Sequence, residues 1–117
     1  MTKKYVLFAF NGDPMCVVHV WLNALDMKEK GYDVKVVIEG SATALIKDYH
    51  ENENTAFRNL YLKTKNAGLI AGVCKACATK MGSIEAVKAE GLPELGDMSG
   101  HPSMSQYTDE GYEIITF

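Results

Sequence analysis

The residues best suited to chemistry are two cysteines, Cys74 and Cys77, which follow the apolar run 69–73. Three residues apart at the start of a helix, they would be neighbours on one helical turn, so their sulfur atoms can lie close together. A helix N-terminus offers unpaired N–H groups and the positive end of the helix dipole, which favour the nucleophilic thiolate. Lys75 would add positive charge beside them. This pattern predicts a reactive thiol site with Cys74 and Cys77 as catalytic residues and Lys75 in support.

Two other interpretations of the cysteine pair are compared with a reactive thiol site. Cysteine often serves as a small apolar core residue, so the chain can instead be a non-catalytic small-ligand-binding or assembly module with inert thiols. Thioredoxin-type redox chemistry also uses a C-x-x-C turn at a helix N-terminus. That motif normally follows an early strand of its fold, whereas Cys74 comes after three predicted strands and three predicted helices. Thioredoxin itself is therefore not favoured.

A small zinc site is the remaining alternative. Cys16 and His19 also stand three residues apart after a predicted strand. Together with Cys74 and Cys77 they would form a Cys₃His set, a known tetrahedral zinc arrangement, if the first and third strands are adjacent. His19 falls on the polar face of its predicted helix, where a solvated histidine is the commoner outcome. The favoured interpretation therefore includes no metal and no cofactor.

Strand and helix signals alternate along the chain and define the elements that position these residues. Apolar runs predict strands, and segments with helical periodicity, bounded by capping residues and glycines, predict the helices between them. The expected strands are 5–10, 33–39, 69–73, 95–98 and 112–117, and the main helices are 14–30, 41–49, 55–67, 83–90 and 104–109. Strands joined by helices pair in parallel through crossovers. The sequence thus predicts an α/β protein, a three-layer α/β/α sandwich around a mostly parallel sheet of about five strands.

The carboxyl ends of parallel strands gather at one edge of the sheet, where ligands usually bind. Asn11, Asp13 and Cys16 follow the first strand and are expected to support the cysteine site from there, although Asp13 also fits a helix cap before Pro14. Glu39 follows the second strand, and a strand-end glutamate is more often solvated. His101 lies in the loop 96–103, which can cover the cysteine turn, but an exposed loop histidine is the commoner case.

Composition narrows the class of protein further. The 117 residues fit one domain, 1–117, and the net charge of −3 with scattered basic residues argues against nucleic-acid binding. No apolar run approaches the roughly 18 residues needed to span a membrane. The first apolar run is too short for a signal peptide, and three cysteines without such a signal indicate a reducing, cytoplasmic location.

Several stretches together resemble the DsrE-like (DsrEFH) family over essentially the whole chain. They are the runs 34–42, 72–78, 81–84 and 110–117. The resemblance implies an α/β sandwich, a homo-oligomer, and a cysteine that carries sulfur as a persulfide. The carrier position maps to Cys74, and Cys77 would resolve the persulfide or line the site. The favoured hypothesis is a sulfurtransferase-like sulfur carrier that works with a sulfur-donor or acceptor protein.

Overall fold

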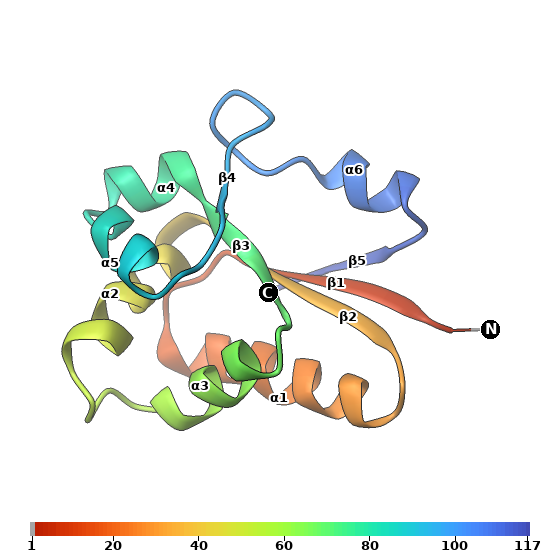
Figure 1. The fold of residues 1–117 in the computed structure, drawn as a ribbon, viewed down its shortest axis with the longest axis horizontal. Helices are drawn as coiled ribbons and strands as arrows, with labels where there is room; N and C mark the ends of the chain where they lie inside the picture. The colour runs from red at the N-terminus through yellow and green to blue at the C-terminus, as the bar shows by residue number, and fades with distance from the viewer. Residues whose placement is uncertain (1) are drawn as a thin grey trace.

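The computed structural model describes residues 2–117, and five parallel strands form its single sheet in the order β4-β3-β2-β1-β5 (Figure 1). The strands are β1 (Lys4–Ala9), β2 (Asp33–Ile38), β3 (Ile70–Cys74), β4 (Glu94–Leu95) and β5 (Glu113–Thr116). The helices are α1 (Pro14–Glu29), α2 (Thr43–Glu51), α3 (Arg58–Asn66), α4 (Lys75–Lys80), α5 (Ile84–Ala89) and α6 (Met104–Asp109), and a 3₁₀ turn, η1 (Gly40–Ala42), precedes α2. The predicted α/β sandwich with a parallel sheet of five strands is confirmed.

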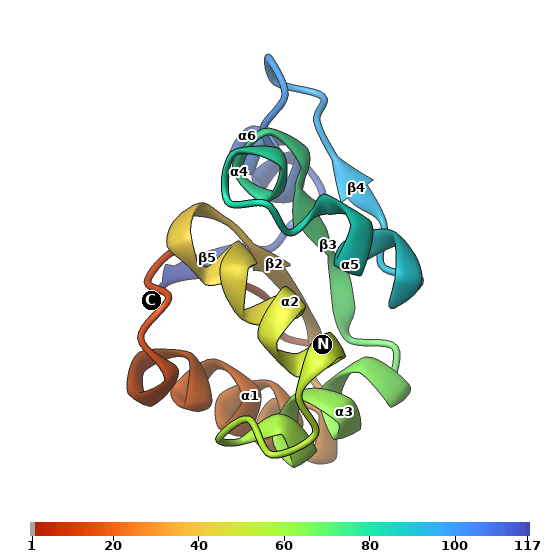
Figure 2. The same cartoon turned by 90° about the vertical axis from the view of Figure 1, so that its left-hand side faces the viewer.

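The two faces of the sheet are covered unequally. Figure 1 and Figure 2 place α1 and α3 on one side of the sheet and α6 on the other. Side chains alternate along β1, so Leu7 joins the large core under the first helical layer, while Val6 and Phe8 join a small core with Tyr107 of α6. The large core therefore holds most of the buried apolar side chains, and one short helix covers the second face.

Helix α1 begins where the sequence predicts. Asp13 caps it by accepting a hydrogen bond from the Met15 N–H at 2.9 Å, and Pro14 is its first residue. The helical spacing of Val18, Trp21, Leu22 and Leu25 predicts that this face meets the sheet, but Leu22 is 46% exposed whereas Val17 and Val20 are buried. The helix is therefore rotated slightly relative to the face that its large apolar residues suggest.

Among the element boundaries that differ from the prediction, those of α3 and β4 have a visible cause or consequence. Helix α3 starts at Arg58 rather than near residue 55, since Phe57 has a left-handed backbone with a φ of 64°. Strand β4 has only two residues, Glu94 and Leu95. A side chain at Gly72 in β3 would approach Leu95 to 2.6 Å, so the glycine allows β4 to pack closely against β3.

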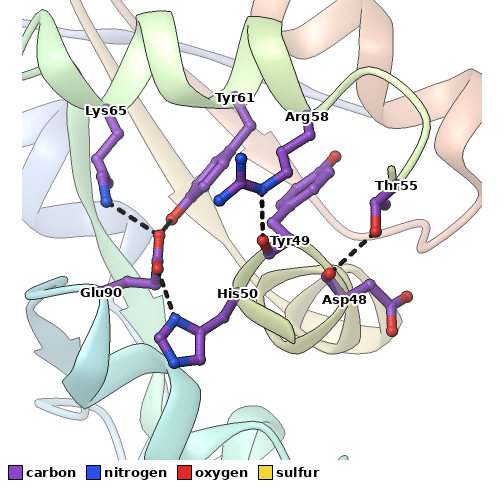
Figure 3. A network of polar contacts seen from close by, with 8 residues as sticks. All are labelled: Asp48, Tyr49, His50, Thr55, Arg58, Tyr61, Lys65 and Glu90. Carbon is purple, nitrogen blue, oxygen red and sulfur yellow. Dashed lines mark hydrogen bonds and ion pairs between the residues drawn. The ribbon is translucent and has the colours of Figure 1, made fainter. Parts of the chain in front are cut away.

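A partly buried polar network joins α2, α3 and the end of α5 (Figure 3). The Glu90 carboxylate accepts hydrogen bonds from the Tyr61 hydroxyl and from Lys65 Nζ, the latter at 2.9 Å, and pairs with His50 Nδ1 at 2.7 Å. Tyr61 also stacks on Tyr49 with ring centroids 4.5 Å apart. These contacts tie three helices together over the large core.

Candidate functional site at the carboxyl edge of the sheet

Cys74 lies at the junction predicted from the sequence. It is the last residue of β3 and the N-cap of α4, and it is fully buried. Its Sγ accepts a hydrogen bond from the Cys77 N–H at 3.4 Å. Cys77 is half-buried on the first turn of α4. The chain thus brings the two sulfurs together at the carboxyl edge of the sheet, as their spacing indicates.

A tight turn after β4 completes the site from the opposite side. Met98 and His101 exchange backbone hydrogen bonds of 2.8 and 2.9 Å, and the two residues between them, Ser99 and Gly100, both have positive φ. This geometry is that of a type I′ turn, which favours glycine or asparagine at both central positions. The Gly100 carbonyl accepts a hydrogen bond from the Ala76 N–H at 2.9 Å and so fastens the turn to α4.

The turn places the His101 imidazole against both thiols. His101 Nδ1 lies 3.2 Å from Cys74 Sγ and 3.8 Å from Cys77 Sγ. Glu39, at the end of β2, is only 7% exposed and adds a carboxylate, so that one ligand atom from each of the four residues lies within 4.8 Å of the others. The expectations of a solvated Glu39 and an exposed His101 are therefore wrong.

Burial dominates the electrostatics of this cluster. It raises the pKa of the Cys74 thiol to about 11, against the opposing effect of the hydrogen bond from the Cys77 backbone. Burial also raises the pKa of Glu39, and the only opposing influence is the nearby charge of His101. Within residues 2–117, no hydrogen bond or ion pair from another side chain reaches the Glu39 carboxylate. The site therefore holds a carboxylate and a thiol in environments that penalise their charged forms.

Two surface pockets border the cluster. One, of about 420 Å³, is lined by Glu39 and His101 together with Phe10, Met98, Pro102, Ser103, Met104 and Ser105. The other, of about 260 Å³, is lined by Cys77 with Gly40, Ser41, Lys80 and Met81. The thiol pair therefore lies between an apolar pocket beside the histidine and a smaller pocket beside α4.

The residues predicted to support the cysteines lie outside the cluster. Asn11 Oδ1 accepts a hydrogen bond from the Asp13 N–H at 2.9 Å, so both residues shape the turn before α1. Cys16 is half-buried in α1, and Lys75 is exposed on α4. None of these four contributes a ligand atom to the group of Glu39, Cys74, Cys77 and His101 in the part of the chain that the structure describes. Their supporting role remains an untested expectation.

The Cys₃His zinc set is not assembled. Strand β2 lies between β1 and β3, so the strands that precede the two cysteine-bearing turns are not neighbours. His19 is exposed on α1, and neither it nor Cys16 belongs to the cluster found among residues 2–117. Glu39 and His101 were not assigned to the site from the sequence. Their positions in the sequence were the available signal, since Glu39 follows the central strand β2 and His101 lies in the loop after the edge strand β4.

The fold and the site define a small parallel α/β protein with a dithiol and a histidine at the carboxyl edge of its sheet. The chain belongs to the DsrE/DsrF-like family, whose sequence model matches residues 4–117. An uncharacterized protein of Methanocaldococcus jannaschii is 36% identical over 99 residues, which cover 85% of this chain and 78% of the relative. An uncharacterized protein of Archaeoglobus fulgidus is 43% identical over 51 residues, 44% of this chain and 84% of the relative.

No solved structure matches the chain. Among the described residues, no helix has the length and apolar character needed to cross a membrane.

Proposed function

We propose that this protein handles sulfur, accepting sulfane sulfur on Cys74 as a persulfide and releasing it with the help of Cys77. The observation that carries the proposal is the convergence of two thiols and an imidazole at the carboxyl edge of a DsrE/DsrF-like fold. The three groups come from two separate segments, the β3–α4 junction and the turn after β4. Such a grouping of nucleophile and base is the usual requirement for an activated thiol.

In the first step, His101 takes the proton of the Cys74 thiol through its Nδ1 atom, which lies 3.2 Å from the sulfur. The Cys74 thiolate then attacks the outer sulfur of a persulfide donor. A new S–S bond forms on Cys74, the S–S bond of the donor breaks, and the donor leaves as a thiolate. The hydrogen bond from the Cys77 N–H stabilises negative charge on Cys74 Sγ before the attack.

The stored sulfur leaves by one of two balanced steps. The thiolate of an acceptor protein attacks the outer sulfur, takes it as a new persulfide and restores the Cys74 thiolate. When no acceptor is present, the Cys77 thiolate attacks the inner sulfur instead, releases hydrosulfide and leaves a Cys74–Cys77 disulfide, which a dithiol reductant restores. The position of Cys77 beside the smaller pocket suits this second role.

The turn 98–101 controls access to the Cys74 sulfur. The Gly100 carbonyl lies 3.8 Å from Cys74 Sγ, and the His101 ring contacts the same atom, so the turn 98–101 covers the sulfur. A donor can reach Cys74 only when this turn moves aside. Sulfur transfer by this route therefore couples loading to a displacement of the turn.

We infer a cytoplasmic homo-oligomer that exchanges sulfur with a donor or acceptor protein. Met15 and Leu22 are 61% and 46% exposed and stand two helical turns apart on one face of α1, which offers an apolar surface for self-association. Light scattering coupled to size exclusion measures the assembly. A strictly monomeric protein at micromolar concentration would contradict the oligomer.

Intact-mass spectrometry of the reduced, metal-free protein before and after treatment with inorganic polysulfide tests the sulfur proposal. We expect a gain of one sulfur atom, mapped to Cys74 by alkylation and peptide analysis. Cys74→Ser should abolish the gain, Cys77→Ser should prolong the life of the persulfide, and Cys16→Ser is the matched control that should behave as the parent. Equal loading of the Cys74→Ser protein would rule the assignment out.

A further inference from the structure

We propose that Glu39, Cys74, Cys77 and His101 form a binding site for one Zn²⁺ ion. This inference is independent of the sulfur proposal, since it concerns the same side chains but a different ligand. The four residues come from the end of β2, the start of α4 and the turn after β4, and their ligand atoms all lie within 4.8 Å of one another. Segments far apart in the sequence thus present four donors to one point.

The distances between donors match a tetrahedral zinc centre. Zinc lies about 2.3 Å from a thiolate sulfur and about 2.0 Å from an imidazole nitrogen, which places the two donors about 3.6 Å apart at the tetrahedral angle. The two S–N distances here are 3.2 Å for Cys74 with His101 and 3.8 Å for Cys77 with His101. Both are within a few tenths of an ångström of the required edge, so only small adjustments are needed to admit an ion.

Glu39 provides the second, independent observation. Glu39 is only 7% exposed, and its carboxylate faces the two sulfurs and the imidazole. No side chain of residues 2–117 donates a hydrogen bond to this carboxylate or forms a salt bridge with it. No side-chain oxygen of the described residues is sealed from solvent without a partner, so the Glu39 carboxylate keeps contact with water in the pocket that it lines, and a bound cation would replace that water with a charged partner. The position of this carboxylate beside two sulfurs and an imidazole, with no salt bridge from a described side chain, therefore points to a positively charged ligand here.

The donor set selects the ion. Two thiolates, one imidazole and one carboxylate suit Zn²⁺, whereas Mg²⁺ and Ca²⁺ prefer oxygen donors alone. The C-x-x-C spacing of Cys74 and Cys77 is also the usual spacing of a zinc-binding cysteine pair. Binding releases the two thiol protons to solvent and leaves one net negative charge on the complex. All four donors come from the protein, as in closed zinc sites.

Zinc binding and sulfur uptake would exclude each other, because the thiolates of Cys74 and Cys77 coordinate the ion when zinc is bound and cannot attack a sulfur donor. Zinc should protect Cys74 and Cys77 from alkylation. Cys16 lies outside the cluster and should react at an unchanged rate. This pattern distinguishes binding at the proposed site from loose binding elsewhere on the surface.

The test is a titration of the reduced, metal-free protein with Zn²⁺ alone against a chromophoric chelator, with Co²⁺ as a spectroscopic probe. We expect one ion per chain and a sulfur-to-cobalt charge-transfer band. Cys77→Ser and His101→Ala should each weaken binding by more than about 10-fold, since even groups that only support a metal ligand cost that much. Glu39→Gln should weaken it as well, and Cys16→Ser should leave it unchanged.

Three results would overturn the inference: no Zn²⁺ binding by the parent protein, binding without the charge-transfer band, or equal loss of affinity in Cys16→Ser and Cys77→Ser. Circular dichroism of each variant without metal shows that a loss of affinity is not a loss of fold. Polysulfide loading is measured on the metal-free protein. A failure of the zinc site therefore leaves the sulfur proposal standing, and the reverse is also true.

Discussion

Two largely buried glutamates, Glu39 and Glu90, behave in opposite ways. The pKa of Glu39 is raised by burial, whereas the pKa of Glu90 is lowered to about 2. Both carboxylates pay the cost of leaving water, so burial does not separate them. The difference lies in their partners, since Glu90 has three and Glu39 has none among the side chains of residues 2–117.

Glu90 shows how this chain stabilises a buried charge. Hydrogen bonds from Tyr61, His50 and Lys65 outweigh the desolvation of its carboxylate, and Figure 3 shows all three side chains converging on it. The same contacts fasten α2 and α3 to the end of α5. This region of the molecule serves stability.

Glu39 faces reactive groups instead of stabilising ones. Its neighbours are two thiols and an imidazole, which are good nucleophiles, bases and metal ligands but are not fixed partners of a carboxylate. A carboxyl group in a pocket whose pKa is shifted by burial is a candidate functional group. Burial alone therefore does not separate the two carboxylates, whereas the side chains that face them do.

The largest expected effect is on Glu90. Replacing it with glutamine removes the charge that Lys65 and His50 face, and should lower the free energy of unfolding by about 2 kcal/mol, because the contacts are charge-assisted but the two partners are partly exposed and screened by solvent. Glu39→Gln should change the free energy of unfolding by no more than about 0.5 kcal/mol in the metal-free protein, because no partner is lost. Urea denaturation of both variants checks the contrast, which equal losses would break.

The contrast should also appear in the pH dependence of stability. Glu90 has a pKa of about 2 in the folded protein against its ordinary value of 4.5, so the folded state takes up the proton at a lower pH than the unfolded state. Its stabilising contribution is complete above about pH 4.5 and is lost as the pH falls towards 2. Thermal or urea unfolding between pH 5 and 2, at points about 0.5 apart, should show a steeper loss in the parent than in Glu90→Gln. Identical slopes would contradict this account of the network.

Gly100→Ala tests whether the turn positions His101. Its φ of 90° disfavours any side chain, and an added Cβ would lie 3.3 Å from that of Ala76. We expect a loss of about 1–2 kcal/mol in stability, together with faster alkylation of Cys74 as the cover is disturbed. Gly31→Ala is the matched control, because Gly31 has a φ of 84° but nothing within 4 Å of an added Cβ. It should lose stability without changing the reactivity of Cys74.

The smallest expected effect is a gain. Ser99 has a φ of 50° in the type I′ turn, where glycine carries no steric penalty. Ser99→Gly should therefore stabilise the protein by up to about 0.5 kcal/mol and leave the pKa of Glu90 and the Tyr61 contact untouched. Urea denaturation measures the change. A clear loss of stability would show that the Ser99 side chain has a role of its own.

Local signals in the sequence were sufficient for the sheet and for the cysteine pair. Alternating apolar runs and capping residues such as Asp13 act over a few residues, and a C-x-x-C spacing brings two sulfurs together wherever a helix begins. The parallel arrangement follows from the helical connections, so the α/β class was predictable as well.

The partners of the cysteines depend on information that the sequence holds only over long distances. Glu39 is buried because β2 lies beside β3, and His101 reaches Cys74 because a turn with two positive φ values is fastened to α4. Neither the order of strands nor the path of that loop follows from local periodicity. The exposed position of Leu22 has a similar origin, since the neighbouring helix α3 decides which face of α1 is covered.

The sulfur-handling claim is tested most directly by mass spectrometry of the metal-free protein and its Cys74→Ser variant after polysulfide treatment. We expect one added sulfur atom on Cys74 of the parent and none on the variant. Equal sulfur uptake by the two proteins, or no uptake by the parent with Cys74 and Cys77 unreactive until denaturation, would contradict it.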